Sequence, residues 1–287
     1  MNKTIEFTIT SQQDGLMIKA VLREYGLSRR EVSRLKFTNG LLVNGNSVRV
    51  TEIVHAQDVV TLHFPEKDEA HALILTQDPE ILYEDEDVVV VNKPAGLPCH
   101  PSHEHLTDDM GTVLQNYYGG KFTVRAVGRL DKDVSGIMVY AKNQPACARL
   151  SQQRGKDTLH KEYYAIVEGI FEKKAGTLRY KLLKVPGRKD RIVSEKGQAC
   201  ITEYTVVQEY SDISLVKVHL ITGRTHQIRA GMAHFHHALL GDSLYGGKDT
   251  FYRPALHCGY VSFEQPFTHK KIEITLPLPE DMQALLQ

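Results

Sequence analysis

The sequence of 287 residues lacks the features that mark several special classes of protein. Its 35 Lys and Arg residues are balanced by 35 Asp and Glu residues, so the formal net charge is zero, which excludes a polybasic tail or a histone-like protein. No apolar run approaches the roughly 20 residues of a membrane-spanning helix. The first ten residues alternate between polar and apolar, without the continuous apolar core of a secretory signal. We therefore expect a soluble protein that is not exported.

Cysteine is scarce as well. The four cysteines are Cys99, Cys147, Cys200 and Cys258. Their wide spacing fits neither a disulfide framework nor a zinc finger, and a reducing cytoplasm fits it best. Apolar residues at 41% and charged residues at 24% are typical of a globular protein. Because domains usually have about 100 to 200 residues, the length predicts two of them.

Helix signals near the N-terminus predict a small first domain. We expect a first helix over residues 14–25. Ser28 and Glu31 have the spacing of a capping box, in which each side chain bonds to the backbone amide of the other at the start of a second helix. Gly40 is suited to end that helix.

Strand signals follow these two helices. The Asn44-Gly45 pair stands between apolar runs and predicts a β-hairpin. Val60, Leu62 and Phe64 alternate with polar residues and predict a further strand. The expected order is helix, helix, hairpin, strand.

Basic residues gather in this first domain. Arg30 and Arg34 share the face of the second helix opposite Val32 and Leu35. Between positions 19 and 49, seven Lys or Arg residues stand against two Glu residues, an excess of five. A solvated helix face would give the same pattern. Clustering on one small domain favours contact with the phosphate backbone of a nucleic acid.

The stretch Leu27-Ser28-Arg29-Arg30-Glu31-Val32, followed by Leu42-Val43-Asn44-Gly45, resembles the S4 RNA-binding domain over about residues 13–64. The resemblance implies that RNA is bound by a short basic set: Arg29, Arg30, Arg34 and Lys36. We therefore expect an S4-like αα-β RNA-binding domain at residues 1–68.

The next segment is acidic. Residues 66–87 contain nine Asp or Glu residues and one lysine, with weak periodicity. This composition predicts a linker at residues 69–87, followed by a second domain at residues 88–287.

Strands dominate the expected second domain. We expect strands near residues 88–92, 137–142, 161–168, 201–207, 215–221, 258–263 and 272–276. Helices are expected at 112–118, at 144–153 with Asn143 as the cap, and at 225–235. Many strands with few, separated helices predict an α+β fold, with a mixed, mainly antiparallel sheet and flanking helices.

Two polar stretches in this domain carry candidate chemistry. Gly128-Arg129-Leu130-Asp131-Lys132-Asp133-Val134-Ser135-Gly136 places carboxylates and an arginine just before a strand. Thr222-Gly223-Arg224-Thr225-His226-Gln227-Ile228-Arg229 crowds polar residues at the start of a helix. Taken alone, each could be an ordinary turn or helix cap.

Together with Lys161-Glu162-Tyr163-Tyr164-Ala165-Ile166-Val167-Glu168-Gly169 and Asn92-Lys93-Pro94-Ala95-Gly96-Leu97, these stretches resemble the RluA-type RNA pseudouridine synthases. The likeness extends to residues 236–242 and to Tyr245-Gly246. It implies a pseudouridine synthase fold and an isomerase that needs no cofactor or metal.

The resemblance also implies the roles of individual residues. Asp131 would be the nucleophile or base on a flipped-out uridine, and Arg229 would keep this carboxylate charged. Tyr163 would be catalytic as well, because it would stack on the base and take part in proton transfer. Ile228 would pack against the other side of the base. Arg129 would support the position that the nucleotide leaves. The substrate-binding set is completed by Arg224, His226 and Gln227.

Two positions depart from the family pattern. The Arg-Leu-Asp motif of the family commonly begins with histidine, and this chain has Gly128 there. Val134 replaces the usual threonine before Ser135. No role of that histidine can be transferred to this chain.

Other interpretations of single features remain open. Asp131 and Asp133 could be the paired carboxylates of a glycosidase, although side chains two residues apart can point in different directions. The histidines near positions 100 and 236 show no H-E-x-x-H or matched Cys/His set, so we expect no metal. Residues 173–196 have nine basic and two acidic residues. This excess of seven favours an RNA-contacting loop over a solvated hairpin.

The sequence thus predicts an RNA pseudouridine synthase that isomerises specific uridines in structured RNA, either ribosomal RNA or tRNA. The alternative is a non-catalytic S4-type RNA-binding protein that retains the fold. We expect a cytoplasmic monomer with no obligatory protein partner and no membrane contact.

Overall fold

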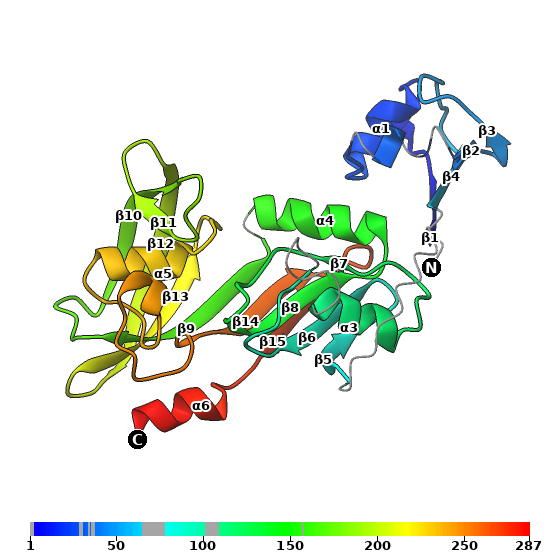
Figure 1. Cartoon of the computed structure of the whole chain (residues 1–287). Helices are drawn as coiled ribbons and strands as arrows, with labels where there is room; N and C mark the ends of the chain where they lie inside the picture. Colours follow the sequence, from blue (N-terminus) through cyan, green and yellow to red (C-terminus); the bar gives the residue numbers. More distant parts are fainter. Residues whose placement is uncertain are drawn as a thin grey trace.

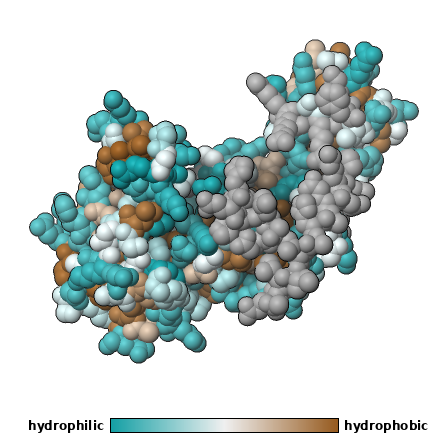
Figure 2. Space-filling view, viewed as in Figure 1, coloured by the Kyte–Doolittle hydropathy of each residue, from teal (hydrophilic) through white to brown (hydrophobic). Residues whose placement is uncertain are grey.

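The computed structural model describes residues 3–28, 31–33, 35, 38–64, 78–100, 109–156 and 158–287. They form a small N-terminal domain and a larger, elongated domain, each with an apolar core of its own. Figure 1 shows the small domain, in blue, to one side of the larger one. On the face shown in Figure 2, the described residues are mostly hydrophilic, with separate apolar patches between them.

Four antiparallel strands form the sheet of the N-terminal domain, in the order β1-β4-β2-β3. Its elements are β1 (Lys3–Thr8), the short helix η1 (Ser11–Gln13), α1 (Ile18–Glu24), β2 (Leu41–Val43), β3 (Asn46–Ser47) and β4 (Val59–Phe64). The predicted first helix, hairpin and final strand are confirmed. Strand β1 was missed, because its alternating pattern gains meaning only beside β4, far along the chain.

Local signals of the N-terminal domain act as the sequence predicts. Asn44 and Gly45 have φ angles of 49° and 77°, the left-handed pair that a type I′ hairpin requires. The Ser28 amide donates to the Glu31 carboxylate at 2.8 Å, and the Glu31 amide donates to the Ser28 hydroxyl at 3.3 Å. This capping box starts the second helix. The expected RNA contacts Arg29, Arg30, Arg34 and Lys36 lie outside the described residues.

One large sheet forms the second domain, in the order β11-β10-β12-β13-β9-β14-β8-β6-β5, with β15 beside β14 and β7 beside β8. Its strands are β5 (Glu80–Glu84), β6 (Val88–Lys93), β7 (Arg125–Ala126), β8 (Ser135–Ala141), β9 (His160–Glu168), β10 (Ala175–Lys184), β11 (Arg191–Val193), β12 (Gln198–Glu209), β13 (Ile213–Leu220), β14 (Leu256–Glu264) and β15 (Lys271–Thr275). Strands β8 and β14 pair in parallel, and the other described pairs are antiparallel. The predicted mixed, mainly antiparallel sheet is confirmed.

Helices flank this sheet in two groups (Figure 1). They are α3 (Met110–Tyr117), α4 (Gln144–Gly155), α5 (Gln227–His234), η2 (Ser243–Tyr245), α6 (Glu280–Gln283) and η3 (Ala284–Leu286). Helix α4 contacts β7, β8 and β14, whereas α5 contacts β10, β11 and β12. As predicted, Asn143 caps α4, accepting from the Ala146 amide at 2.9 Å. Within the described ranges, no helix is long and apolar enough to cross a membrane.

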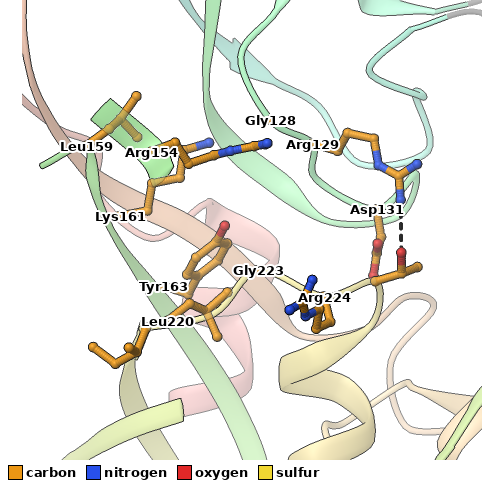
Figure 3. A pocket seen from close by; sticks show the side chains of 12 residues that line it. Gly128, Arg129, Asp131, Arg154, Leu159, Lys161, Tyr163, Leu220, Gly223 and Arg224 are labelled. Atoms are coloured by element: carbon orange, nitrogen blue, oxygen red, sulfur yellow. Dashed lines mark hydrogen bonds between the residues drawn. The ribbon is translucent and has the colours of Figure 1, made fainter. Parts of the chain in front are cut away.

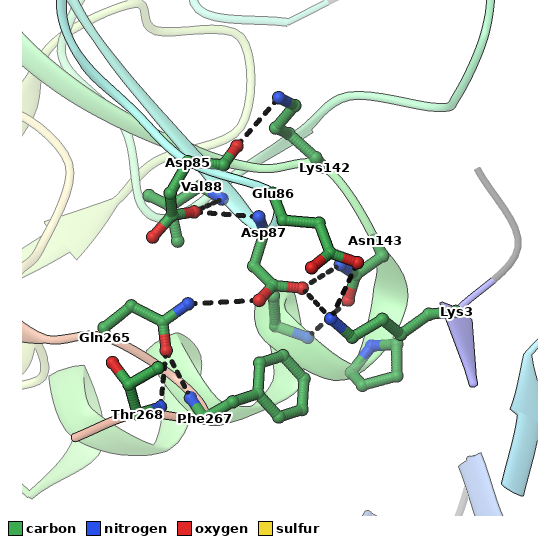
Figure 4. Close-up of polar contacts among 12 residues, drawn as sticks. Lys3, Asp85, Glu86, Asp87, Val88, Lys142, Asn143, Gln265, Phe267 and Thr268 are labelled. Atoms are coloured by element: carbon green, nitrogen blue, oxygen red, sulfur yellow. Dashed lines mark hydrogen bonds and ion pairs between the residues drawn. The ribbon is translucent and has the colours of Figure 1, made fainter. Parts of the chain in front are cut away.

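The end of the acidic segment belongs to the large domain. From Glu80 onward the expected linker forms β5, which pairs with β6, and only its part up to residue 77 lies outside the described residues. Asp87 is buried and accepts from Asn143 at 2.7 Å and from Gln265 at 3.0 Å (Figure 4). Lys3 of the N-terminal domain pairs with the same carboxylate at 2.7 Å. Acidic composition alone therefore misplaced the end of the linker, because these carboxylates have partners.

Candidate active site

The loop that carries Asp131 runs from residue 128 to residue 134 and leads into β8; we call it the Asp131 loop. Lys93, at the end of β6, is fully buried beneath it. The Lys93 ammonium donates to the carbonyl oxygens of Lys132 at 3.0 Å, Pro94 at 2.7 Å and Leu97 at 2.8 Å. Burial lowers the pKa of Lys93 to about 8. The motif at residues 92–97 thus holds the motif that contains Asp131 in place.

Asp131 and Tyr163 line the same cavity, which has a volume of about 400 Å³ (Figure 3). Tyr163 comes from β9, so a third motif meets the loop here. Leu220, at the end of β13, lies beside Tyr163. Four cationic side chains also line the cavity: Arg129, Arg154, Lys161 and Arg224. A carboxylate, an aromatic ring and several cations in one cavity suit a flat base that carries phosphate groups.

The phenol of Tyr163 is 7% exposed. Burial raises its pKa well above the ordinary value of a tyrosine. The hydroxyl therefore keeps its proton at neutral pH. Tyr163 can therefore offer an aromatic face and a hydrogen-bond donor.

Arg229, from α5, connects two carboxylates. Its Nη1 lies 3.4 Å from Asp131 Oδ2, the pairing that the sequence predicts. Its Nε and Nη2 donate to the two oxygens of Asp242, each at 2.7 Å. Burial opposes the charge of Arg229, but the contacts with Asp242 and Asp131 outweigh this effect and raise its pKa. Asp242 fixes the guanidinium from behind and leaves Nη1 for Asp131.

Asp242 was not among the predicted site residues. It is 1% exposed, and its role depends on a helix that lies earlier in the chain. A signal was present, because the family resemblance extends through Gly241 and Asp242. The partner of this carboxylate could not be read from spacing.

His226 precedes α5 and has a left-handed backbone with φ of 58°. Its Nε2 lies 3.8 Å from Asp131 Oδ2, and its Nδ1 lies 2.9 Å from the hydroxyl oxygen of Tyr245. Burial lowers the pKa of His226, against the opposite pull of the Asp131 carboxylate. The ring is therefore neutral at pH 7.

Arg129 and Arg224 lie where the sequence predicts substrate contacts. Both line the 400 Å³ cavity. The Arg129 Nη2 also donates to the Thr225 hydroxyl at 3.1 Å, which ties the Asp131 loop to the segment before α5 (Figure 3).

Gln227 and Ile228 do not line this cavity. Gln227 is 2% exposed, and its amide group bonds to the hydroxyls of Thr202 and Thr222, to the Ile201 carbonyl and to the Arg224 amide. Ile228 is 4% exposed and belongs to the apolar core. The packing of α5 thus turns both side chains away from the cavity, whereas Ile228 was expected against the face of the base opposite Tyr163.

The basic segment at residues 173–196 contains the strands β10 and β11, which pair as a hairpin. We call residues 184–191, the connection together with the strand residue on either side of it, the basic tip. Four of its side chains line a wider groove of about 760 Å³ that also contains Asp131: Lys184, Arg188, Lys189 and Arg191. The segment is therefore a hairpin, and its basic side chains are placed where they could also contact RNA, so the two interpretations of its sequence do not exclude each other.

A family comparison agrees with this geometry. Residues 87–236 match the model of the family described as RNA pseudouridylate synthase. The chain belongs to this family. It is an RNA pseudouridine synthase of the RluA type.

Full-length relatives support the assignment. The chain is 35% identical over 279 residues to a Bacillus subtilis protein named uncharacterized RNA pseudouridine synthase YjbO, covering 95% of this chain and 99% of the relative. It is 31% identical over 309 residues to ribosomal large subunit pseudouridine synthase D of Zymomonas mobilis, covering 99% and 97%. The fold is shared with the structure of human RNA pseudouridylate synthase domain containing 4, with a TM-score of 0.60 and 24% identity over 72% of this chain and 91% of that one.

The departures of this pseudouridine synthase from the family motif have local explanations. Gly128 has φ of +84°, and a Cβ atom there would lie 3.1 Å from Nη1 of Arg154. Arg154 thus occupies the space beside the position where the family commonly has histidine. Val134 is buried, and its amide donates to the Asp131 carbonyl at 3.1 Å. The loop turn is kept without a threonine hydroxyl.

Metal ligands are not gathered in the described part of the enzyme. Within the described ranges no group of three His, Cys, Asp or Glu side chains could hold a metal ion. His237 instead stacks on Phe171, with ring centroids 3.7 Å apart. His257 lies 2.9 Å from the Ser135 hydroxyl, and burial lowers its pKa to about 4.

Proposed function

We propose that this pseudouridine synthase isomerises specific uridines in structured RNA, with Asp131 as the nucleophile on a flipped-out uridine. The observation that carries the proposal is the position of Asp131: it shares a cation-lined cavity with Tyr163 and is paired with an arginine that a second carboxylate fixes. In the reaction the bond from ribose C1′ to uracil N1 breaks and a bond from C1′ to C5 forms. C5 loses its proton and N1 gains one, so no oxidant or cofactor is needed.

A flipped-out nucleotide fits the arrangement of the cavity. Leaving the base stack costs a few kcal/mol, and contacts with phosphates can offset this cost. Arg129, Arg154 and Lys161 offer positive charge around a cavity whose wall carries the ring of Tyr163. The base can stack on that ring while the carboxylate reaches the sugar or the pyrimidine.

Ribosomal RNA is the proposed target. The support is the name of the relatives called ribosomal large subunit pseudouridine synthase D, one of them 31% identical over nearly the whole chain. RNA would be held by the basic tip and, in the N-terminal domain, by Arg29, Arg30, Arg34 and Lys36. Mapping the modified positions that are lost when the gene is deleted tests the target. Loss of pseudouridine from tRNA alone would overturn the choice of ribosomal RNA.

Release of tritium from cellular RNA containing 5-tritiated uridine tests the role of Asp131. Replacing Asp131 with Asn removes the nucleophile at nearly constant size, so we expect the rate to fall about 10³-fold or more. RNA affinity, measured by filter binding, should change little. Equal tritium release from the wild type and the variant would contradict the role of Asp131.

A further inference from the structure

The contacts of His226 form a chain that starts in the basic tip and ends at Asp131. The Arg191 backbone amide donates to the Tyr245 hydroxyl oxygen at 2.7 Å. That oxygen lies 2.9 Å from His226 Nδ1, and Nε2 of the same ring lies 3.8 Å from Asp131 Oδ2.

The direction of each hydrogen bond in this chain follows from its chemistry. A backbone amide can only donate, so the Tyr245 oxygen accepts from Arg191. Burial raises the pKa of Tyr245, so its hydroxyl keeps a proton to donate. Among the described residues, His226 Nδ1 is the acceptor within reach of that hydroxyl. The proton of the neutral ring is then on Nε2, the atom that faces Asp131.

We propose that His226 is a positioning residue for Asp131, and that the Tyr245 hydroxyl and the Arg191 amide fix the tautomer in which Nε2–H points to the Asp131 carboxylate. This role rests on the proposed function of Asp131. The carboxylate would then have two donors, Nη1 of Arg229 and Nε2 of His226. Contacts of this kind are often long in an empty active site and shorten when substrate binds.

The backbone at His226 supports the assignment. A left-handed conformation is uncommon for a residue other than glycine, and it persists when the surroundings hold it in place. Here φ of 58° directs the ring between Tyr245 and the Asp131 loop. The next residue back, Thr225, accepts a hydrogen bond from Arg129 of the same loop.

Charged groups surround the ring on several sides, and they oppose one another. Asp131 on its loop and Asp242 before η2 favour a charged ring, whereas burial, Arg229 on α5 and Arg191 on β11 favour the neutral form. The Arg229 guanidinium also lies 5.3 Å from the centroid of the Tyr245 ring. Removing the Tyr245 hydroxyl leaves these charges in place and deletes its two contacts in the chain, with the Arg191 amide and with His226 Nδ1.

The test replaces Tyr245 with Phe and follows His226 by NMR of histidine labelled with ¹⁵N and ¹³C. The lost hydroxyl stabilised the neutral ring through Nδ1, so we expect the pKa of His226 to rise and the Nε2–H tautomer to lose population. The single-turnover rate at saturating RNA should fall about three- to tenfold, the range of one net hydrogen bond. RNA affinity should stay unchanged. Tyr260→Phe is the matched control, because its hydroxyl donates to Glu273 on β15.

A second variant, His226→Asn, removes the imidazole ring. Asparagine tolerates the left-handed backbone at this position. Once the ring is absent, Tyr245→Phe should lower the rate no further, because both changes break the same chain. Additive losses, or an unchanged His226 resonance in Tyr245→Phe, would overturn the proposal. So would a loss confined to KM for RNA, which would make His226 a substrate contact.

These outcomes separate the proposal from the function on which it rests. If Asp131→Asn keeps its activity, the proposed function of Asp131 fails. If Asp131→Asn is inactive while Tyr245→Phe keeps the wild-type rate and His226 tautomer, only the role of His226 fails.

Discussion

Two arginine–aspartate pairs with the same two-bond geometry lie near the Asp131 groove, one buried and one exposed. Arg229 and Asp242 join at 2.7 Å through both oxygens, with side chains 7% and 1% exposed. In the basic tip, Nε and Nη2 of Arg188 donate to the two oxygens of Asp190 at 2.9 and 2.7 Å, and the two side chains are 57% and 18% exposed. Water screens the second pair and not the first. The buried pair can therefore hold the Arg229 guanidinium toward Asp131, whereas the exposed arginine can exchange its partner for an RNA phosphate.

The largest expected effect is on the stability of the protein, and it should differ between the buried and the exposed pair. Asp242→Asn leaves the Arg229 charge buried with a weaker partner, so we expect a loss of about 3 kcal/mol in the free energy of unfolding. Urea unfolding followed by circular dichroism measures it. The matched change Asp190→Asn should leave the unfolding midpoint unchanged. Equal losses in the two variants would contradict the contrast between buried and exposed pairs.

Lys93 extends the comparison to a buried cation that bonds to carbonyl groups. Its folded pKa of about 8 lies below the ordinary 10.5. Between these values the unfolded chain binds a proton that the folded chain has released, so this contribution to stability rises with pH. The free energy of unfolding of the wild type, relative to that of Lys93→Met, should increase by up to about 3 kcal/mol from pH 8 to pH 10.5. Urea unfolding at several pH values measures the gain, and a flat difference would contradict the lowered pKa.

The exposed cations of the basic tip should affect affinity and leave folding intact. Replacing Lys184, Arg188 and Lys189 with Gln should weaken RNA binding at low salt about tenfold or more and reduce its salt dependence, because each lost phosphate contact removes about 0.7 to 0.9 from the slope of log K against log salt. Filter binding over a salt series measures both. An unchanged slope would show that the tip does not contact RNA. The single-turnover rate at saturating RNA should stay the same.

The smallest expected effect concerns the predicted RNA contacts of the N-terminal domain. Changing Arg29, Arg30 and Arg34 to Gln should lower RNA affinity a few-fold and reduce the salt slope, through the same loss of phosphate contacts. The unfolding midpoint and the rate at saturating RNA provide the controls. If affinity and slope both remain at wild-type values, the N-terminal domain has another role.

Much of the fold could be predicted where the local sequence had one interpretation. The apolar run of β6 and the Asn-Gly turn after β2 gave correct elements, because burial and backbone preference act there within a few residues. Strands β1, β5 and β10 were missed. Their charged or alternating residues are stable as strands only beside partners elsewhere in the chain.

The candidate site divides in the same way. Motif resemblance identified Asp131, Tyr163 and Arg229, and the structure brings them to one region. It could not show that α5 turns Ile228 into the core, away from the cavity that Tyr163 lines. The orientation of a helical side chain depends on how the whole helix packs, and spacing along the chain does not determine it.

The sequence by itself determined the family, the mixed α+β class, and the local caps and turns, and it singled out Asp131 as the carboxylate that we propose reacts. Those properties depend on residue types at short spacings. Only the tertiary structure decided that Asp242 fixes Arg229, that Lys93 lies under the Asp131 loop, and that His226 reaches Tyr245. Each of these contacts joins segments that are distant in the chain, and their strength comes from burial that exists only after the sheet and helices have packed.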